Sequence, residues 1–319
     1  METRHDDPPV RSAETGGTRT TVDAVLRWTP AQPVFHWRAA RNLAVLAYHD
    51  IRDQDRFAAQ LDHLSRAASP VHLDDVVGAA QGGGGLPRRA VLVTFDDGHR
   101  DVFEVAMPML RERGIPAVAF AVAGLIGTET PHWWSEVKEL VRTGGTAPAV
   151  ADLRPDDAVR ALKKVPNDAR VRSIEELRRT ALRPASPVHQ LTEQELTLLE
   201  SAGISIGSHS LSHPCLSTCD PATIRTEVEG SHAILARALG HEIESFAYPD
   251  GDRDARVADA VKKAGHRVAF LFDHRLSSSH PTDPFHISRL RMDADATFDR
   301  FRIILSGLHP TIHHLRGLR

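Results

Sequence analysis

Two adjacent carboxylates, Asp96 and Asp97, follow directly after an apolar stretch and stand before Gly98. Residues 90–95 are rich in Val and Leu, which predicts a strand buried on both faces, as in a parallel sheet covered by helices. In barrels of alternating strands and helices, catalytic side chains lie at the carboxyl ends of the strands. Two acids there are unfavourable unless a metal, a proton or a substrate compensates them. Alone, the pattern is equally compatible with a solvated Asp-Gly turn, so other parts of the chain must decide.

A histidine pair offers partners for these acids. His209 and His213 follow the apolar residues 204–206 and lie in a segment that contains Pro214. Two neutral imidazoles and one carboxylate form a three-ligand set that leaves a divalent metal open to water or substrate. A pair at this spacing is usually incidental in a chain with 19 histidines. However, both motifs directly follow predicted buried strands, so a parallel barrel would bring them to one mouth, with Asp97 as the third ligand.

The elements that must position these residues alternate along the chain. Apolar strand-like segments are expected at 42–48, 90–95, 117–122, 204–206, 244–248, 268–272 and about 287–292. Segments with helical spacing lie between most of them, and Thr192 and Glu195 form a capping box before one. Alternation of this kind is typical of an α/β protein with parallel strands. Because no internal repeat is visible, the count predicts a single closed or nearly closed barrel.

Three segments depart from the alternating pattern. Residues 1–40 are polar and are expected to be flexible, and 311–319 are expected to form a C-terminal tail beyond a barrel domain at 41–310. From 131 to 187 the chain is charged and punctuated by prolines, which predicts a mostly helical insertion over the barrel mouth. Trp133 and Trp134 begin this insertion and could form a platform for a sugar ring, although a tryptophan pair that opens a helix is more often packing.

Composition excludes several classes of partner. The chain has 39 basic and 42 acidic residues and a formal net charge of -3, which disfavours nucleic acid and acidic membranes as partners. Cys215 and Cys219 cannot form a disulfide framework, which fits a reducing compartment. No apolar run reaches transmembrane length, and the N-terminus lacks the apolar core of a signal peptide. The expectation is a soluble cytoplasmic protein; its oligomeric state stays open.

The combination of motifs resembles the polysaccharide deacetylase family, carbohydrate esterase family 4. The resemblance is carried by Thr94-Phe95-Asp96-Asp97-Gly98, Ser208-His209-Ser210-Leu211-Ser212-His213-Pro214, Leu46-Ala47-Tyr48-His49, Leu86-Pro87 and Phe246-Ala247-Tyr248-Pro249-Asp250-Gly251. The last motif is similar to the branch of the family with Phe-Ala-Tyr-Pro. Together the motifs cover about residues 42 to 305 in order. The resemblance implies an α/β fold, a distorted (β/α)7-type barrel with a helical insertion.

The resemblance also implies roles for individual residues. Asp97, His209 and His213 would bind a divalent metal, most often Zn²⁺, and Asp96 would act as general base. Such a metal polarises an amide carbonyl and lowers the pKa of water. A backbone N–H at Asp250 would help to stabilise the tetrahedral oxyanion, with Tyr248 of the same motif also on the substrate side. Acetate and a free amine would be the products.

The sequence departs from the family pattern near the predicted base. Many members carry an arginine where Ala247 stands, braced against the catalytic base. Arg289 is a candidate replacement, and an ordinary surface salt bridge is an equally good interpretation of it. Asp250 replaces the usual aromatic residue, which keeps the backbone donor and adds a negative charge. This charge could select a substrate that carries a cation or hydroxyl groups.

The general acid is the second departure. The family uses a histidine in a Leu-x-His motif near the C-terminus, and His309 is a poor match to it. His49, at the end of the first predicted strand, is the candidate to protonate the leaving amine. The alternative is that a histidine at a strand end only forms hydrogen bonds with its neighbours. His99, directly after Gly98, is interpreted as structural.

These inferences predict a metal-dependent N-deacetylase that hydrolyses the acetamide of an N-acetylated sugar. A soluble small glycoside or biosynthetic intermediate is preferred to a cell-wall polymer, because no secretion signal or binding repeat is visible. One alternative is an amide hydrolase acting on a non-sugar metabolite. Another is a non-catalytic sugar-binding relic of the fold, against which the intact Asp96, Asp97, His209 and His213 argue.

Overall fold

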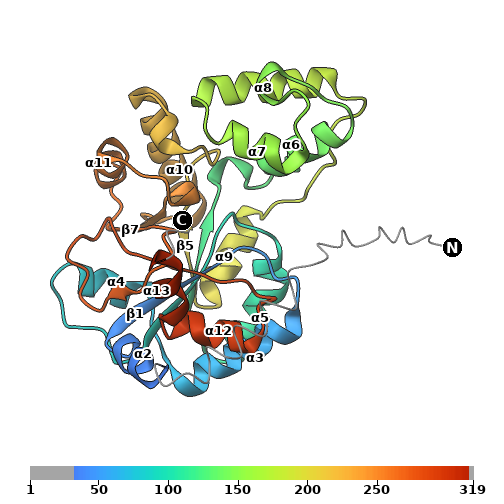
Figure 1. The fold of residues 1–319 in the computed structure, drawn as a ribbon. Coiled ribbons are helices and arrows are strands. Elements are labelled where there is room, and N and C mark those ends of the chain that lie inside the picture. Colours follow the sequence, from blue (N-terminus) through green and yellow to red (C-terminus); the bar gives the residue numbers. More distant parts are fainter. Residues whose placement is uncertain (1–31, 316–319) are drawn as a thin grey trace.

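Six parallel strands form most of a strongly curled sheet in the computed structural model, which describes residues 32–315 (Figure 1). In spatial order they are β7 (Val268–Phe270), β6 (Ser245–Ala247), β5 (Ile204–Ser208), β4 (Ala117–Ala121), β3 (Ala90–Phe95) and β1 (Asn42–Tyr48). The pairing of β1 with β3 runs from Ala44 opposite Val91 to Tyr48 opposite Phe95. The register aligns the carboxyl ends of these two strands, so the residues after them emerge together.

A seventh segment spans the gap between the outer strands. Its β9 (Leu290–Arg291) pairs in parallel with β1, while Ile287, just before it, forms a parallel bridge with Phe270 of β7. The short β2 (Ser69–Pro70) pairs with β3, and β8 (Ser277–Ser278) runs antiparallel to β1. This arrangement confirms the predicted fold class, a distorted (β/α)7-type barrel.

Apolar side chains fill both faces of the sheet because helices cover its outside. All residues of β3 and β4 are buried, as expected for parallel strands between layers. The helices of the barrel and its ends are α2 (Gln32–Ala39), α3 (Gln54–Ala67), α4 (Leu73–Ala80), α5 (Met107–Glu112), α9 (Glu193–Ser201), α10 (Pro221–Leu239), α11 (Ala255–Lys263), α12 (Phe298–Leu305) and α13 (Leu308–Leu315). A π-helical turn (Val102–Ala106) precedes α5. The capping box predicted at Thr192 and Glu195 is present at the start of α9.

Three helices form a separate group beyond the carboxyl ends of the strands, at the top of Figure 1. They are α6 (Trp133–Arg142), α7 (Pro155–Leu162) and α8 (Asn167–Thr180). Their apolar faces pack into a core of their own, which includes Val137, Leu140, Val150, Ala158, Leu162, Ile174 and Leu177. The segment predicted as a helical insertion therefore lies where it can reach the mouth of the barrel.

Both predicted tails are partly helical. Residues 32–39 form α2, so the end of the segment expected to be flexible is ordered, and residues 1–31 lie outside the described part of the chain. Residues 311–315 belong to α13, whose first turn is held by the buried Leu308 and Pro310. Between residues 32 and 315, no helix has both the length and the apolar character needed to cross a bilayer.

Candidate metal and catalytic site

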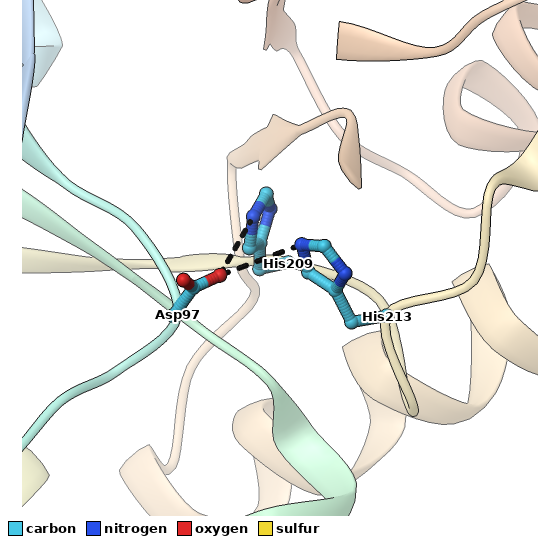
Figure 2. Close-up of side chains that lie close together, drawn as sticks. All are labelled: Asp97, His209 and His213. Atoms are coloured by element: carbon cyan, nitrogen blue, oxygen red, sulfur yellow. Dashed lines mark ion pairs between the residues drawn. The ribbon is translucent and has the colours of Figure 1, made fainter. Parts of the chain in front are cut away.

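The structure brings Asp97, His209 and His213 together, as Figure 2 shows. Asp97 Oδ1 lies 3.5 Å from Nε2 of His209 and 3.4 Å from Nε2 of His213. Two donors bound about 2.0–2.1 Å from one tetrahedral ion lie about 3.3 Å apart. The three side chains are therefore already spaced as ligands of a single small cation, and all three are buried.

The backbone conformation explains how two consecutive side chains at the end of β3 enter one pocket. Neighbouring residues of a regular strand point to opposite faces. Here β3 ends at Phe95, and Asp97 and Gly98 have φ values of 71° and 72°. This left-handed turn directs the side chains of Asp96 and Asp97 into the same pocket. A Cβ on Gly98 would also lie 3.3 Å from Cα of Ala121, so both conformation and space favour glycine.

The protonation states suit a metal. Nδ1 of His209 donates to the carbonyl of Ala247 at 2.8 Å, which leaves the lone pair of Nε2 facing Asp97. Burial lowers the pKa of His213 to about 3, so this imidazole is neutral. Burial alone would raise the pKa of Asp97, but the hydrogen bond from His99 holds it well below its usual value.

Two polar atoms at this centre have no hydrogen-bond partner. Asp97 Oδ1 and His213 Nδ1 are both buried and unsatisfied within the described structure. A buried anionic oxygen without a donor is unfavourable. A cation at this position would supply the missing partner of Asp97, so the residues present fit a divalent metal.

Asp96 has a different partner. Its carboxylate accepts two hydrogen bonds from Arg289, from Nη1 at 2.6 Å and from Nη2 at 2.8 Å. Arg289 is fully buried, and its Nε donates to the carbonyl of Leu271 at 2.6 Å. Burial alone would raise the pKa of Asp96, but the charge of Arg289 leaves it below its usual value. Of the two interpretations of Arg289, the brace against Asp96 agrees with this geometry, and a surface salt bridge does not.

These residues line one pocket with a volume of about 210 Å³. His49 lies in it, and its ring packs edge-on against Phe272 with centroids 5.2 Å apart. The other lining residues are Asp96, Asp97, His209, His213, Asp250, Phe272 and, from the insertion, Trp134, Lys138, Val159 and Lys163. The barrel therefore supplies the ionisable centre, while the insertion supplies one wall of the pocket.

Two residues of the Phe-Ala-Tyr-Pro motif occupy different environments. Asp250 has a φ of 55°, lines the pocket and forms an ion pair with Lys163. Tyr248, in contrast, is fully buried, and its hydroxyl donates to the carbonyl of Phe285 at 3.2 Å. The prediction that Tyr248 contacts the substrate is therefore not supported, because its side chain is part of the packed layer between β6 and α11.

Several residues that support the site had no clear signal in the sequence. His99 Nε2 lies 3.6 Å from Asp97 Oδ2, so the histidine interpreted as structural lies directly beside a proposed metal ligand. Glu227 of α10 accepts hydrogen bonds from the main-chain N–H groups of Leu211 and Ser212 at 3.0 and 2.8 Å. It thereby fixes the loop that carries the two histidines. The contact depends on how α10 packs against this loop, which the sequence does not show.

A family model described as polysaccharide deacetylase matches residues 83–147 and 174–269, about half of the chain. The matched parts contain all of the metal-ligand candidates and Asp96. The chain belongs to the polysaccharide deacetylase family. Residues 148–173, in the middle of the helical insertion, lie between the two matched parts, so this portion of the insertion is not described by the family model.

Curated relatives from the family match part of the chain. The poly-β-1,6-N-acetyl-D-glucosamine N-deacetylase of Staphylococcus aureus (strain MRSA252) is 36% identical over 218 residues, which cover 67% of this chain. A putative polysaccharide deacetylase of Bacillus subtilis is 21% identical over 180 residues, which cover 56% of this chain and 43% of the relative. The aligned region spans only 58% of the length of the Staphylococcus aureus relative.

Solved structures of the family share the fold. The Streptococcus pyogenes deacetylase PplD, in complex with acetate, aligns with a TM-score of 0.59 and 17% identity over 84% of this chain and 98% of its own. IcaB from Ammonifex degensii aligns with a TM-score of 0.56 and 20% identity over 84% of this chain and 97% of its own. At this level of identity the likeness establishes the architecture.

Proposed function

We propose that this protein is a metal-dependent N-deacetylase that hydrolyses the acetamide of an N-acetylglucosamine-containing glycan. One observation carries the proposal: neighbouring carboxylates in one pocket have separate partners. Asp97 faces two imidazoles with an unsatisfied oxygen, and Asp96 is held by a buried arginine. A binding protein has no need of this division, whereas a metal-dependent amide hydrolase uses both a cation and a base.

Asp97, His209 and His213 are the residues that would hold the metal, and Zn²⁺ fits their donor set of two imidazoles and one carboxylate. A bound divalent ion would polarise the amide carbonyl and acidify water. Asp96 is ionised, and its fixed orientation lets it accept the proton of a water molecule that attacks the acetyl carbon. The backbone N–H of Asp250 is the proposed donor to the resulting oxyanion.

His49 is the proposed general acid. It lines the same pocket as Asp96, with Phe272 packed against its ring. When the tetrahedral intermediate collapses, the bond between the acyl carbon and nitrogen breaks, and His49 gives its proton to the amine nitrogen. Acetate and a free amino sugar leave. Arg289 keeps the carboxylate of Asp96 oriented throughout.

The names of the curated relatives support a polymeric substrate. The Staphylococcus aureus relative is named for poly-β-1,6-N-acetyl-D-glucosamine, which favours a polysaccharide over the small soluble glycoside that the sequence alone suggested. Trp134 offers an aromatic face in the pocket, a surface suited to the apolar face of a sugar ring. A cytoplasmic location remains a prediction.

Acetate release tests this proposal. Zinc-loaded protein is incubated with poly-β-1,6-N-acetylglucosamine, with β-1,4-linked N-acetylglucosamine oligomers, with N-acetylglucosamine itself and with simple N-acetyl amides. We expect release from at least one glycan, and release at least about 100-fold slower in Asp96→Asn. Release only from the non-sugar amides would instead favour the metabolite amidase. No release from any compound, with sugar binding retained, would favour the relic.

A further inference from the structure

The helical insertion donates hydrogen bonds to the backbone carbonyl groups of two proposed metal ligands. His132, at the start of α6, donates from Nε2 to the carbonyl oxygen of Asp97 at 3.0 Å. Its neighbour Trp133 donates from Nε1 to the carbonyl oxygen of His213 at 2.9 Å. Both hydrogen bonds are buried. Two consecutive residues at the start of one helix therefore reach the segments that follow two different strands, β3 and β5.

A third residue of the insertion, in α8, also donates to one of these carbonyl groups. Arg170 directs Nη1 toward the same carbonyl oxygen of His213, at 3.4 Å, and its guanidinium carbon lies 4.7 Å from the centre of the Trp133 ring. Two hydrogen bonds to Oδ1 of Asn167, at 3.1 and 2.6 Å, hold the guanidinium in place. Arg170 is only 5% exposed, so its charge is directed inward onto the His213 carbonyl.

Asp97 and His213 have backbone conformations that are unfavourable without contacts from other parts of the protein. Asp97 and His213 have φ values of 71° and 58°, in the left-handed region that residues other than glycine seldom adopt. Such conformations persist where the surroundings determine them. A hydrogen bond to each carbonyl fixes the adjacent peptide plane and, through it, the direction in which the ligand side chain leaves the backbone.

The insertion is built to act as one body. Its core is separate from the barrel core, and Trp133 belongs to that core while also contacting His213. The ring of Trp134 packs against the ring of His213 with centroids 4.5 Å apart. A change in the position of the insertion would therefore move both ligand carbonyls at once.

We infer that the helical insertion positions the metal centre, with His132, Trp133 and Arg170 as positioning residues for Asp97 and His213. The inference rests on the proposed metal site. It assigns the insertion a role beyond forming a wall of the pocket: it sets the affinity for the metal. Residues that orient the ligands of a metal typically alter its affinity by 10- to 100-fold when they are replaced.

The test is the affinity of the purified full-length protein for Zn²⁺, measured by competition with a chromophoric chelator. Trp133→Phe keeps the packing and removes the donor, and we expect about tenfold weaker binding. His132→Phe should weaken binding by a similar factor. His132→Gln keeps a donor at this position and should restore binding to near the wild-type affinity. Unchanged affinity in both Phe variants would overturn the inference.

Two control variants separate positioning from general stability. Leu64→Ala loosens the barrel core in α3, away from the insertion, and Arg178→Gln removes an ion pair to Glu136 within the insertion. Both should keep the wild-type affinity for Zn²⁺, even where the melting temperature falls. Equal losses of affinity in the controls and in Trp133→Phe would reduce the effect to stability and overturn the inference.

Hydrogen exchange of the wild-type protein gives a readout that depends on no variant. Adding Zn²⁺ should slow amide exchange in α6 and α8 and leave α4, on the barrel side, unchanged. Unchanged exchange in α6 and α8 upon zinc binding would contradict the coupling. If the wild-type protein binds no Zn²⁺ at all, the proposed metal site itself fails, a result distinct from equal affinities among the variants.

Discussion

Asp96 and Asp97 are chemically identical neighbours that acquire different properties from their surroundings. The guanidinium of Arg289 forms an ion pair with Asp96, and the imidazoles of His209 and His213 lie next to Asp97. The turn at Asp97 and Gly98 lets both carboxylates enter one pocket despite the alternation of side chains along a strand. The two carboxylates therefore suit the two roles proposed for them, Asp96 as base and Asp97 as metal ligand.

Replacing Asp96 tests the role of the base. In Asp96→Asn the side chain keeps its size but no longer accepts a proton, so kcat should fall by about 10²- to 10⁴-fold. The affinity for Zn²⁺ should stay near that of the wild-type protein because Asp96 is outside the ligand set. Steady-state acetate release and a zinc titration measure the two quantities. Wild-type kcat in the variant would exclude Asp96 as base.

Arg289 should affect turnover more than substrate binding. Arg289→Gln leaves a buried carboxylate without its partner, which should lower the free energy of unfolding by about 3–5 kcal/mol. Because Arg289 is fully buried and does not line the pocket, kcat should fall while KM changes little. Denaturant unfolding and steady-state kinetics measure both effects. A raised KM with wild-type kcat would contradict this role.

The sequence predicted most of this centre and missed its supports. Asp96, Asp97, His209 and His213 follow apolar runs, and the carboxyl ends of parallel strands converge. For Arg289 the sequence cannot distinguish a brace against the base from a surface salt bridge, because its partner is 193 residues away in the chain. The structure buries the side chain of Tyr248, directly after the three-residue strand β6, and motif spacing alone does not show this burial.

At the scale of the element, the insertion changes the electrostatics of the pocket. Lys163, the residue directly after α7, forms an ion pair with Asp250, and both residues line the pocket. Burial alone would raise the pKa of Asp250, but Lys163 keeps it below its usual value. The negative charge expected to select cationic substrates is thus already compensated by a lysine. Sequence could place this insertion over the mouth, but the pairing depends on how its three helices pack.

Removing that lysine should reveal the charge of Asp250. Lys163→Gln should lower KM for a partly deacetylated, cationic glycan relative to the fully acetylated glycan, by about two- to fivefold. The size follows from the roughly 0.5–1 kcal/mol of a partly exposed ion pair. Lys164→Gln, at the neighbouring position outside the pocket lining, is the control. An unchanged KM ratio in Lys163→Gln would show that Asp250 does not sense the charge of the substrate.

At the scale of the whole molecule, alternation and burial predicted the barrel well. The buried strands specify a parallel sheet, and closure by the segment at 287–291 follows once seven strands are available. Buried histidines, in contrast, could not be distinguished from surface ones in a chain with 19 of them. Two that lie away from the catalytic pocket, His266 and His274, are buried and neutral, and burial lowers the pKa of each to about 3.

These buried histidines should make the fold sensitive to acid. The pKa of His266 is about 3 in the folded protein and 6.5 in the unfolded chain. Between these two pH values the unfolded chain therefore binds a proton at His266 and the folded protein does not. Stability therefore decreases as pH falls through this window, by about 1.4 kcal/mol per unit and per histidine. In His266→Asn, the loss of unfolding free energy between pH 7 and pH 5 should shrink by about 2 kcal/mol.

Urea unfolding at both pH values measures this difference. His189→Asn, at an exposed position, is the matched control and should keep the wild-type pH dependence. An equal loss of stability in wild type and His266→Asn would show that His266 takes up its proton in the folded state.

Asp97, His209 and His213 are proposed to hold one catalytic metal ion. The most direct measurement removes metal with a chelator and then follows acetate release from an N-acetylglucosamine glycan as Zn²⁺ is returned in steps. We expect no activity in the metal-free protein and a linear recovery that ends at one equivalent per chain. Full activity without metal, or equal recovery in His209→Ala, would contradict it.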